Sequence, residues 1–123
     1  MGKANFVTTL FDGRGNPNKV TVAFTMALNA VQKGHDTTLI LMVEAVELGK
    51  PYATDGLNIG APFEPVDVLM KKYLDVGGKV AICGSCMIHN GFKAEEMDSR
   101  FEIINAPQVI DLLMGAQGTL QLA

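Results

Sequence analysis

The stretch V-A-I-C-G-S-C-M-I-H-N-G-F, residues Val80–Phe92, decides how the chain folds and where its chemistry lies. An apolar run ends at Cys83 and meets a glycine at once, which predicts a short buried strand that turns directly into a helix. Both cysteines of the chain, Cys83 and Cys86, lie within four consecutive residues, and His89 follows three residues later. This clustering points to thiol chemistry at the strand–helix junction.

Apolar strands and amphipathic helices alternate on both sides of this stretch. Strand patterns cover residues 3–10, 37–43, 79–83, 101–105 and 118–122. Helical patterns cover residues 18–33, 65–76, 84–90 and 106–114, with short pieces at 44–49 and 93–97. The strand at 37–43 is nearly all apolar, which indicates burial on both faces. The alternation predicts an α/β fold, a parallel sheet with helices on both faces.

The composition is that of one globular domain spanning residues 1–123, with 48% hydrophobic and 19% charged residues. The net charge is −3 and no run of lysine and arginine exceeds two residues, which argues against a nucleic-acid partner. The longest apolar run, Leu39–Val43, is too short to span a bilayer, and the amino terminus lacks a signal-peptide pattern. We therefore expect a cytoplasmic protein.

Three loops are expected to meet at one edge of the sheet. The carboxyl ends of parallel strands share an edge, and open α/β sheets bind their ligands there. Residues 12–16, 52–63 and 83–89 each follow a strand, the second after a short helical piece. We expect these loops to line one cleft, with the candidate residues Asp12, Gly13, Asn58, Gly84 and Ser85.

The two cysteines admit four interpretations. They are apolar fillers, a persulfide-carrying nucleophile, a Cys83–Cys86 thiol–disulfide couple, or metal ligands. A helix amino terminus stabilises a thiolate and lowers its pKa, which favours a reactive Cys83. The C-x-x-C-x-x-H pattern supplies three ligands, whereas a closed zinc site needs four, so metal ranks last and no cofactor is expected.

The chain resembles the DsrE/DsrF-like family, which has the YchN-like fold. The likeness covers nearly the whole chain. It lies in a first strand followed by a turn loop and an Ala-rich helix ending at Gly34-His35, and in the piece Val46-Glu47-Leu48. Its strongest element is the strand that ends in a cysteine with a glycine eight residues later, here Cys83 and Gly91.

The resemblance implies a mostly parallel five-stranded sheet assembled into homotrimers or homohexamers. The better-studied members are sulfur-relay subunits, and their sulfur-accepting cysteine matches Cys83. Relay members often have arginine before the glycine, where this chain has His89-Asn90. Cys86 lies outside the simplest relay pattern.

These observations together predict a carrier that accepts sulfane sulfur at Cys83 and passes it on, at most a sulfurtransferase-like protein. Cys86 is the predicted resolving thiol and His89 the group that moves a proton, with sulfur donor and acceptor proteins as partners. The prediction requires the Cys83 sulfur to be reachable from outside. The alternatives are a small-ligand-binding or structural homo-oligomer without thiol chemistry, and a CxxC redox module.

Overall fold

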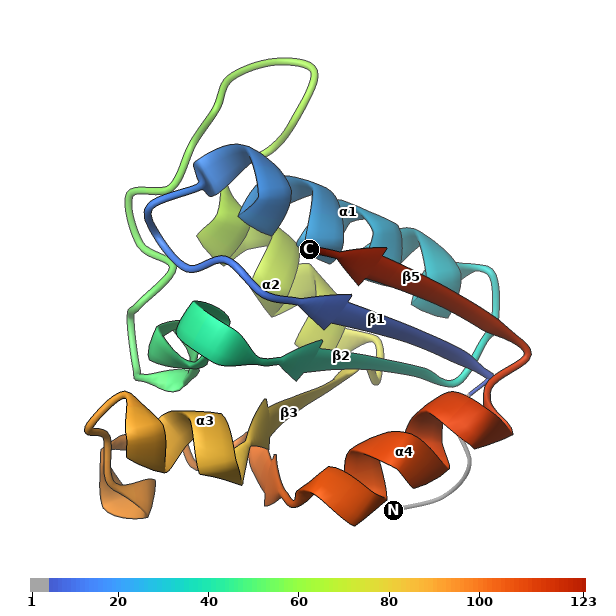
Figure 1. Ribbon diagram of the computed structural model, residues 1–123. Coiled ribbons are helices and arrows are strands. Elements are labelled where there is room, and N and C mark those ends of the chain that lie inside the picture. The colour runs from blue at the N-terminus through green and yellow to red at the C-terminus, as the bar shows by residue number, and fades with distance from the viewer. Residues whose placement is uncertain (1–4) are drawn as a thin grey trace.

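All five strands of the protein join one parallel sheet (Figure 1). The computed structural model describes residues 5–123, and the strand order across the sheet is β4-β3-β2-β1-β5. The strands are β1 (Phe6–Leu10), β2 (Thr37–Leu41), β3 (Lys79–Cys83), β4 (Glu102–Ile104) and β5 (Gly118–Leu122). Every neighbouring pair runs parallel, so the five-stranded α/β architecture predicted from the sequence is confirmed.

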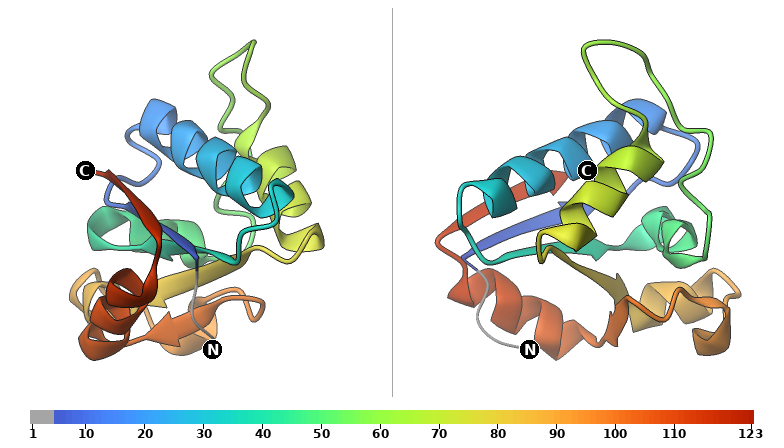
Figure 2. Two further views of the ribbon diagram at one scale, coloured as in Figure 1. Left: turned by 90° about the vertical axis from the view of Figure 1, so that its right-hand side faces the viewer. Right: turned by 180° about the vertical axis from the view of Figure 1, so that it is seen from behind.

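Helices cover both faces of this sheet and its carboxyl edge. They are α1 (Pro17–Gln32), the 3₁₀ helix η1 (Val43–Gly49), α2 (Val66–Asp75), α3 (Gly84–His89), the 3₁₀ helix η2 (Ala94–Glu96) and α4 (Ala106–Gly115). Figures 1 and 2 show α1 and α2 on one face, α4 on the other, and η1 and α3 beyond the ends of β2 and β3. Within residues 5–123 no helix combines the length and apolarity needed to cross a bilayer.

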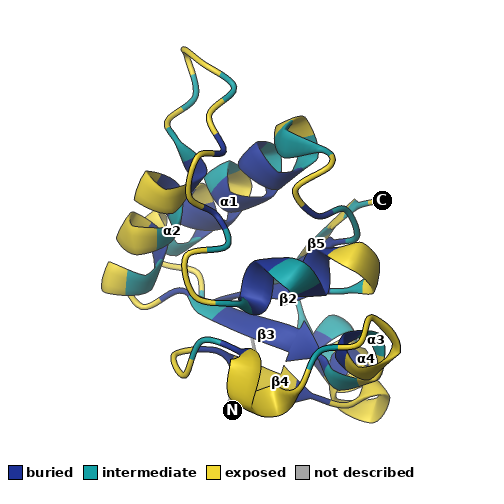
Figure 3. Cartoon of the chain, turned by 90° about the vertical axis from the view of Figure 1, so that its left-hand side faces the viewer, coloured by how far each residue is buried: buried dark blue, intermediate teal, exposed yellow. Residues whose placement is uncertain are grey.

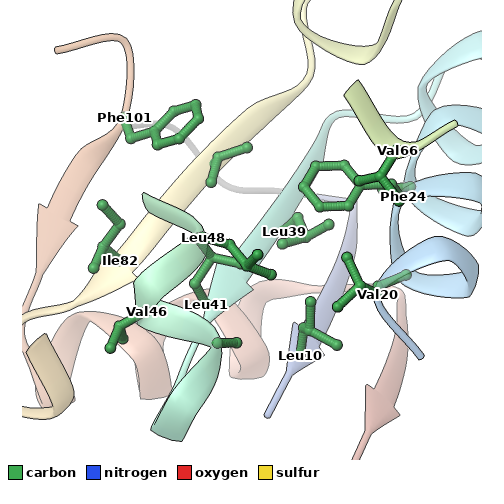
Figure 4. Close-up of a cluster of buried hydrophobic side chains, with 14 of the residues drawn as sticks. Leu10, Val20, Phe24, Leu39, Leu41, Val46, Leu48, Val66, Ile82 and Phe101 are labelled. Atoms are coloured by element: carbon green, nitrogen blue, oxygen red, sulfur yellow. The ribbon is translucent and has the colours of Figure 1, made fainter. Parts of the chain in front are cut away.

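Two hydrophobic layers follow from the alternation of side chains along the strands. On one face the larger cluster packs β2 residue Leu39 with Phe24 of α1 and Val66 of α2, as Figure 4 shows. On the other face Ile40 packs with Val109 of α4. Because neighbouring residues of a strand point to opposite faces and both faces of β2 are covered, all five of its residues are buried.

The ends of α1 follow the expected helix signals. Asn16 caps the helix, since its side chain accepts a hydrogen bond of 3.2 Å from the Lys19 N–H, and Pro17 is the first helical residue. Gly34 follows the last turn with a φ of 93°, a backbone conformation that glycine adopts without strain.

Strand boundaries differ from the predicted ones where the backbone changes direction. The first strand was predicted to start at residue 3, and residues 1–4 lie outside the described part of the chain. The second was predicted to extend to Val43 but ends at Leu41, because Val43 has a φ of 54° and begins η1. An apolar pattern contains no signal for that left-handed residue.

Tyr73 joins the start of β3 to the core. Its ring is fully buried, and its hydroxyl lies 3.1 Å from the Thr37 carbonyl and 2.6 Å from the Lys79 carbonyl while accepting a 3.0 Å bond from the Lys79 N–H. Burial raises the pKa of Tyr73 far above its ordinary value, so the hydroxyl stays protonated. A Cβ on Gly78 would lie 2.2 Å from the ring, so the position needs glycine.

Asp98 makes the best-formed ion pair of the described residues, and its loss gives a testable pH dependence. Its carboxylate accepts bonds of 3.0 and 2.7 Å from the Arg100 side chain, which hold the pKa of Asp98 below its usual range. This stabilisation is fully present above about pH 4 and is lost as the pH falls through the lower folded-state pKa. We expect Asp98→Asn to lower the free energy of unfolding by about 1 kcal/mol at neutral pH, since Arg100 is half exposed.

Urea unfolding at neutral and acid pH measures this effect. The difference between Asp98→Asn and the wild type should shrink below about pH 4. Asp75→Asn is the matched control, because Asp75 pairs with Lys71 at a largely exposed surface site and should change stability little. A difference for Asp98→Asn that is equal at both pH values would contradict the assignment.

Candidate functional site

The two thiols lie in contact at the carboxyl end of β3. Cys83 is the last residue of the strand, beside Ile104 of β4, and Cys86 lies in the first turn of α3. Cys86 packs against the core cluster that contains Cys83, and the adjoining Cys83 thiol contributes to the shift in its pKa. The sequence had predicted that Cys83 would be the outward-facing sulfur. The structure corrects this expectation, because Cys83 is only 5% exposed and belongs to the core, whereas Cys86 is half-buried.

The burial order of the thiols follows from how β4 and α3 pack together. A Cβ on Gly84 would lie 3.3 Å from both the Ile103 side chain and the Ile104 carbonyl, so the chain leaves β3 tightly against β4. Met87, on the inner side of α3, is also buried and lies in the same cluster as Cys83. The junction therefore places the first cysteine inward and leaves the second at the surface of the helix.

Val43, the first residue of η1, lies beside the outer thiol. Its φ of 54° is unusual for a β-branched residue, which rarely adopts this conformation without support from the surrounding structure. The support comes from Asn90, whose side chain donates to the Val43 carbonyl at 3.3 Å and to the Cys86 carbonyl at 2.8 Å. The Val43 backbone in turn acts on the Cys86 thiol, whose pKa it lowers.

Burial dominates the ionisation of the outer thiol. Desolvation raises the pKa of Cys86, the hydrogen bond from the Val43 backbone opposes that rise, and the adjoining Cys83 thiol adds to it. The largest of these effects is the partial removal of the Cys86 thiol from water.

His89 and Ser85 lie on the exposed part of α3. His89 is three residues beyond Cys86, a spacing that puts the two on neighbouring parts of the helix surface. Ser85 precedes Cys86 and is exposed, as is Ile88, at 71%. Gly91, with a φ of 83°, ends the helix as the sequence predicted. The thiol pair thus has polar groups on its solvent side.

The loop after β1 packs on η1. Asp12 accepts a 3.0 Å hydrogen bond from the Asn16 side chain and pairs with Lys19 at 3.2 Å, so it supports the start of α1. A Cβ on Gly13 would collide with the Glu47 carboxylate, which accepts a 3.0 Å bond from the Arg14 N–H. Asp12 and Gly13 therefore lie at the same edge of the sheet as α3, beside η1.

Asn58 belongs to a loop that closes on itself. The Val66 N–H donates to the Leu57 carbonyl at 2.9 Å, and the Asn58 side chain accepts from the Gly60 N–H at 3.0 Å. Residues 58–65 project from the body of the protein and are exposed or half-buried (Figure 3). The structure thus separates the five predicted cleft residues into three places: Gly84 and Ser85 at the thiols, Asp12 and Gly13 at η1, and Asn58 on the projecting loop.

A cavity of about 530 Å³ lies away from all of these residues. It opens between α2 and the segment before β4, and its charged lining includes Asp67, Lys71, Asp75, Asp98 and Arg100. Two ion pairs occupy much of this lining, Lys71 with Asp75 and Arg100 with Asp98. In the described range 5–123, no three or more His, Cys, Asp or Glu side chains are grouped to hold a metal ion.

Sequence reasoning missed Val43 and Asn90. Nothing in the apolar run at 37–43 marks Val43 as left-handed. Asn90 precedes Gly91, so its position indicates the end of a helix, and only the packing of α3 against η1 brings its amide to the Val43 carbonyl.

Comparison with known proteins concerns the family and the fold. A model of the DsrE/DsrF-like family matches residues 7–122. Among solved structures, the ychN protein from E. coli superposes with a TM-score of 0.75 at 17% identity, covering 98% of this chain and 99% of its own. A conserved protein of unknown function, BT1422 from Bacteroides thetaiotaomicron, superposes with a TM-score of 0.62 at 20% identity, covering 95% and 94%. No curated protein matches.

Proposed function

The chain belongs to the DsrE/DsrF-like family, and from that membership together with its paired thiols we propose that it carries sulfane sulfur as a persulfide on Cys83. The observation that supports the proposal is the contact of two free thiols where β3 meets α3. Because this family is associated with sulfur relay, we take sulfane sulfur to be the group that the protein carries. The carrier would act in a reducing cytosol, where paired cysteines serve more often in chemistry than in structural disulfides.

The transfer is a thiol exchange that needs no cofactor. A protein thiolate attacks the outer sulfur of a donor persulfide, a new S–S bond forms on the protein, and the donor leaves as its own thiolate. The persulfide that results on Cys83 would lie beneath α3, away from free thiols in solution. His89, exposed on the same helix, is the proposed proton carrier, since histidine exchanges protons readily near neutral pH.

Intact mass measurement tests the proposal. The protein is incubated with glutathione persulfide, freed of donor and chased with reduced glutathione. We expect the wild type to keep the mass of one added sulfur atom and Cys83→Ser to keep none. A wild type that gains no sulfur, or equal retention by Cys83→Ser, would refute the carrier role.

The contact between the thiols also favours a thiol–disulfide redox module as a second candidate. In that case one thiol would take the outer sulfur of the donor and the other would attack the inner sulfur of the new persulfide, which releases hydrogen sulfide and leaves a Cys83–Cys86 disulfide. Before the chase this product is read as the loss of two hydrogens with no sulfur retained. The mass of the product therefore separates the two functions in one measurement.

Self-association is the proposed arrangement of the carrier, as a homotrimer or homohexamer. On α4, Ile110 and Met114 are 57% and 81% exposed, and their spacing of four residues places them on one face of the helix. Exposed apolar side chains grouped in this way are typical of protein–protein contacts. Donor and acceptor proteins are the further partners, and they would approach the thiol edge of the sheet.

A further inference from the structure

The burial order of the two thiols bears on the route by which sulfur enters. Cys83 is 5% exposed and packed in the core, whereas Cys86 is half-buried on α3 and in contact with it. A donor persulfide approaching from solvent meets the Cys86 sulfur first. Direct attack by Cys83 would require a donor to reach a sulfur that the folded chain leaves almost without solvent contact.

We propose that Cys86 is the entry thiol, which takes the sulfur from the donor and passes it inward to Cys83; this inference rests on the proposed carrier function. In the first step the Cys86 thiolate attacks the outer sulfur of the donor persulfide, and the donor thiolate leaves. In the second step Cys83 attacks that same outer sulfur, its S–S bond forms, and the Cys86 S–S bond breaks.

The second step balances without an oxidant or a reductant. One sulfur atom moves from the Cys86 persulfide to the Cys83 thiol, and the proton of Cys83 passes to the departing Cys86 sulfur. The two residues lie close together, with Cys86 packed against the buried cluster that contains Cys83, so the sulfur and the proton have only a short distance to move. Cys86 ends the sequence as a free thiol, ready to accept again.

The surroundings of Cys86 fit an entry position. The Asn90 side chain donates to the Val43 carbonyl at 3.3 Å and to the Cys86 carbonyl at 2.8 Å, so it joins η1 to α3 beside the outer thiol. The Val43 backbone also opposes the rise in the pKa of Cys86. These interactions give the left-handed backbone of Val43 a role at the thiol pair.

Transfer of the sulfur from Cys86 to Cys83 protects it from thiols in solution. A persulfide on Cys86 would remain accessible to reduced glutathione, which removes the outer sulfur by the same exchange. A persulfide on Cys83 would be attached to a sulfur that is buried in the core. In this pair Cys86 would accept sulfur at the surface and Cys83 would keep it in the core. A single cysteine at either position could do only one of the two.

Time-resolved intact mass with glutathione persulfide, followed by a chase with reduced glutathione, tests the route. We expect Cys86→Ser to load at least about tenfold more slowly than the wild type, because attack on Cys83 then waits for a local opening of α3. We expect Cys83→Ser to load at the wild-type rate but to lose its sulfur in the chase. Ile88→Ser is the matched control on the exposed part of α3 and should load and retain as the wild type does.

Two outcomes would overturn the route while leaving the carrier function intact. These are loading of Cys86→Ser at the wild-type rate, and a Cys83→Ser variant that takes up no sulfur before the chase. A wild type that takes up no sulfur would instead overturn the carrier function itself. Thermal melts of each variant check the fold, and Cys86→Ala replaces Cys86→Ser if the serine lowers the melting temperature.

Discussion

Tyr73→Ala is expected to lower the free energy of unfolding by about 3–5 kcal/mol, the range for removing a large buried ring. The ring is fully buried between α2 and the sheet, and its hydroxyl satisfies the Lys79 N–H and lies against the Thr37 carbonyl. Tyr73→Phe keeps the ring but leaves the Lys79 N–H without its partner, so it should cost about 1–3 kcal/mol. Urea unfolding followed by circular dichroism measures both.

The other tyrosine of the chain provides the control. Tyr52 is 81% exposed, so Tyr52→Ala should change stability by no more than about 0.5 kcal/mol. Gly78→Ala should also destabilise, because its Cβ would lie 2.2 Å from the Tyr73 ring, and the cost should fall when Tyr73 is alanine as well. Additive losses in that double variant, or a Tyr73→Ala protein as stable as the wild type, would contradict the packing described.

The second large effect concerns assembly. Replacing both Ile110 and Met114 with glutamate is expected to convert the proposed homo-oligomer into a monomer, because it places two charges on the exposed apolar face of α4. Size-exclusion chromatography with light scattering gives the mass of each species. The fold should persist, since both side chains point away from the core.

Val76→Glu is the control for this pair of substitutions. Val76 is 52% exposed after the last turn of α2, so a charge there tests whether any new glutamate lowers the mass. The α4 interface is excluded if the wild type is already monomeric, or if the doubly substituted protein keeps the wild-type mass.

The architecture could be predicted from the sequence because local signals agree with tertiary packing along most of the chain. The strand at Lys79–Cys83 and the last strand at Gly118–Leu122 have the predicted bounds, since each apolar run is flanked by glycine or by a helix start. The second strand was predicted two residues too long at Val43. There the packing of η1 against α3 decides the backbone conformation, and residue type alone does not indicate it.

The two cysteines of the site could be predicted from the sequence, but the extent to which each is buried could not. Cys83 and Cys86 are close in sequence, so their contact follows from a strand that turns into a helix. Which of them faces solvent depends on β4 and η1, segments far from the cysteines in sequence, and the expected exposure of Cys83 was wrong. Asn58 follows β2 in the chain, yet its loop closes on itself and leaves the thiol edge.

The anchored end and the thiol-bearing end of β3 lie at opposite ends of its five residues. Tyr73 fastens the strand at Lys79, and Cys83 stands at its other end, about 13 Å away at a rise of about 3.3 Å per residue. A substitution at the thiol end, such as a change of Cys86, therefore leaves the Tyr73 contacts that fix the register of the strand in place. The reactive end of this strand can be altered without loss of the anchor that its fold needs.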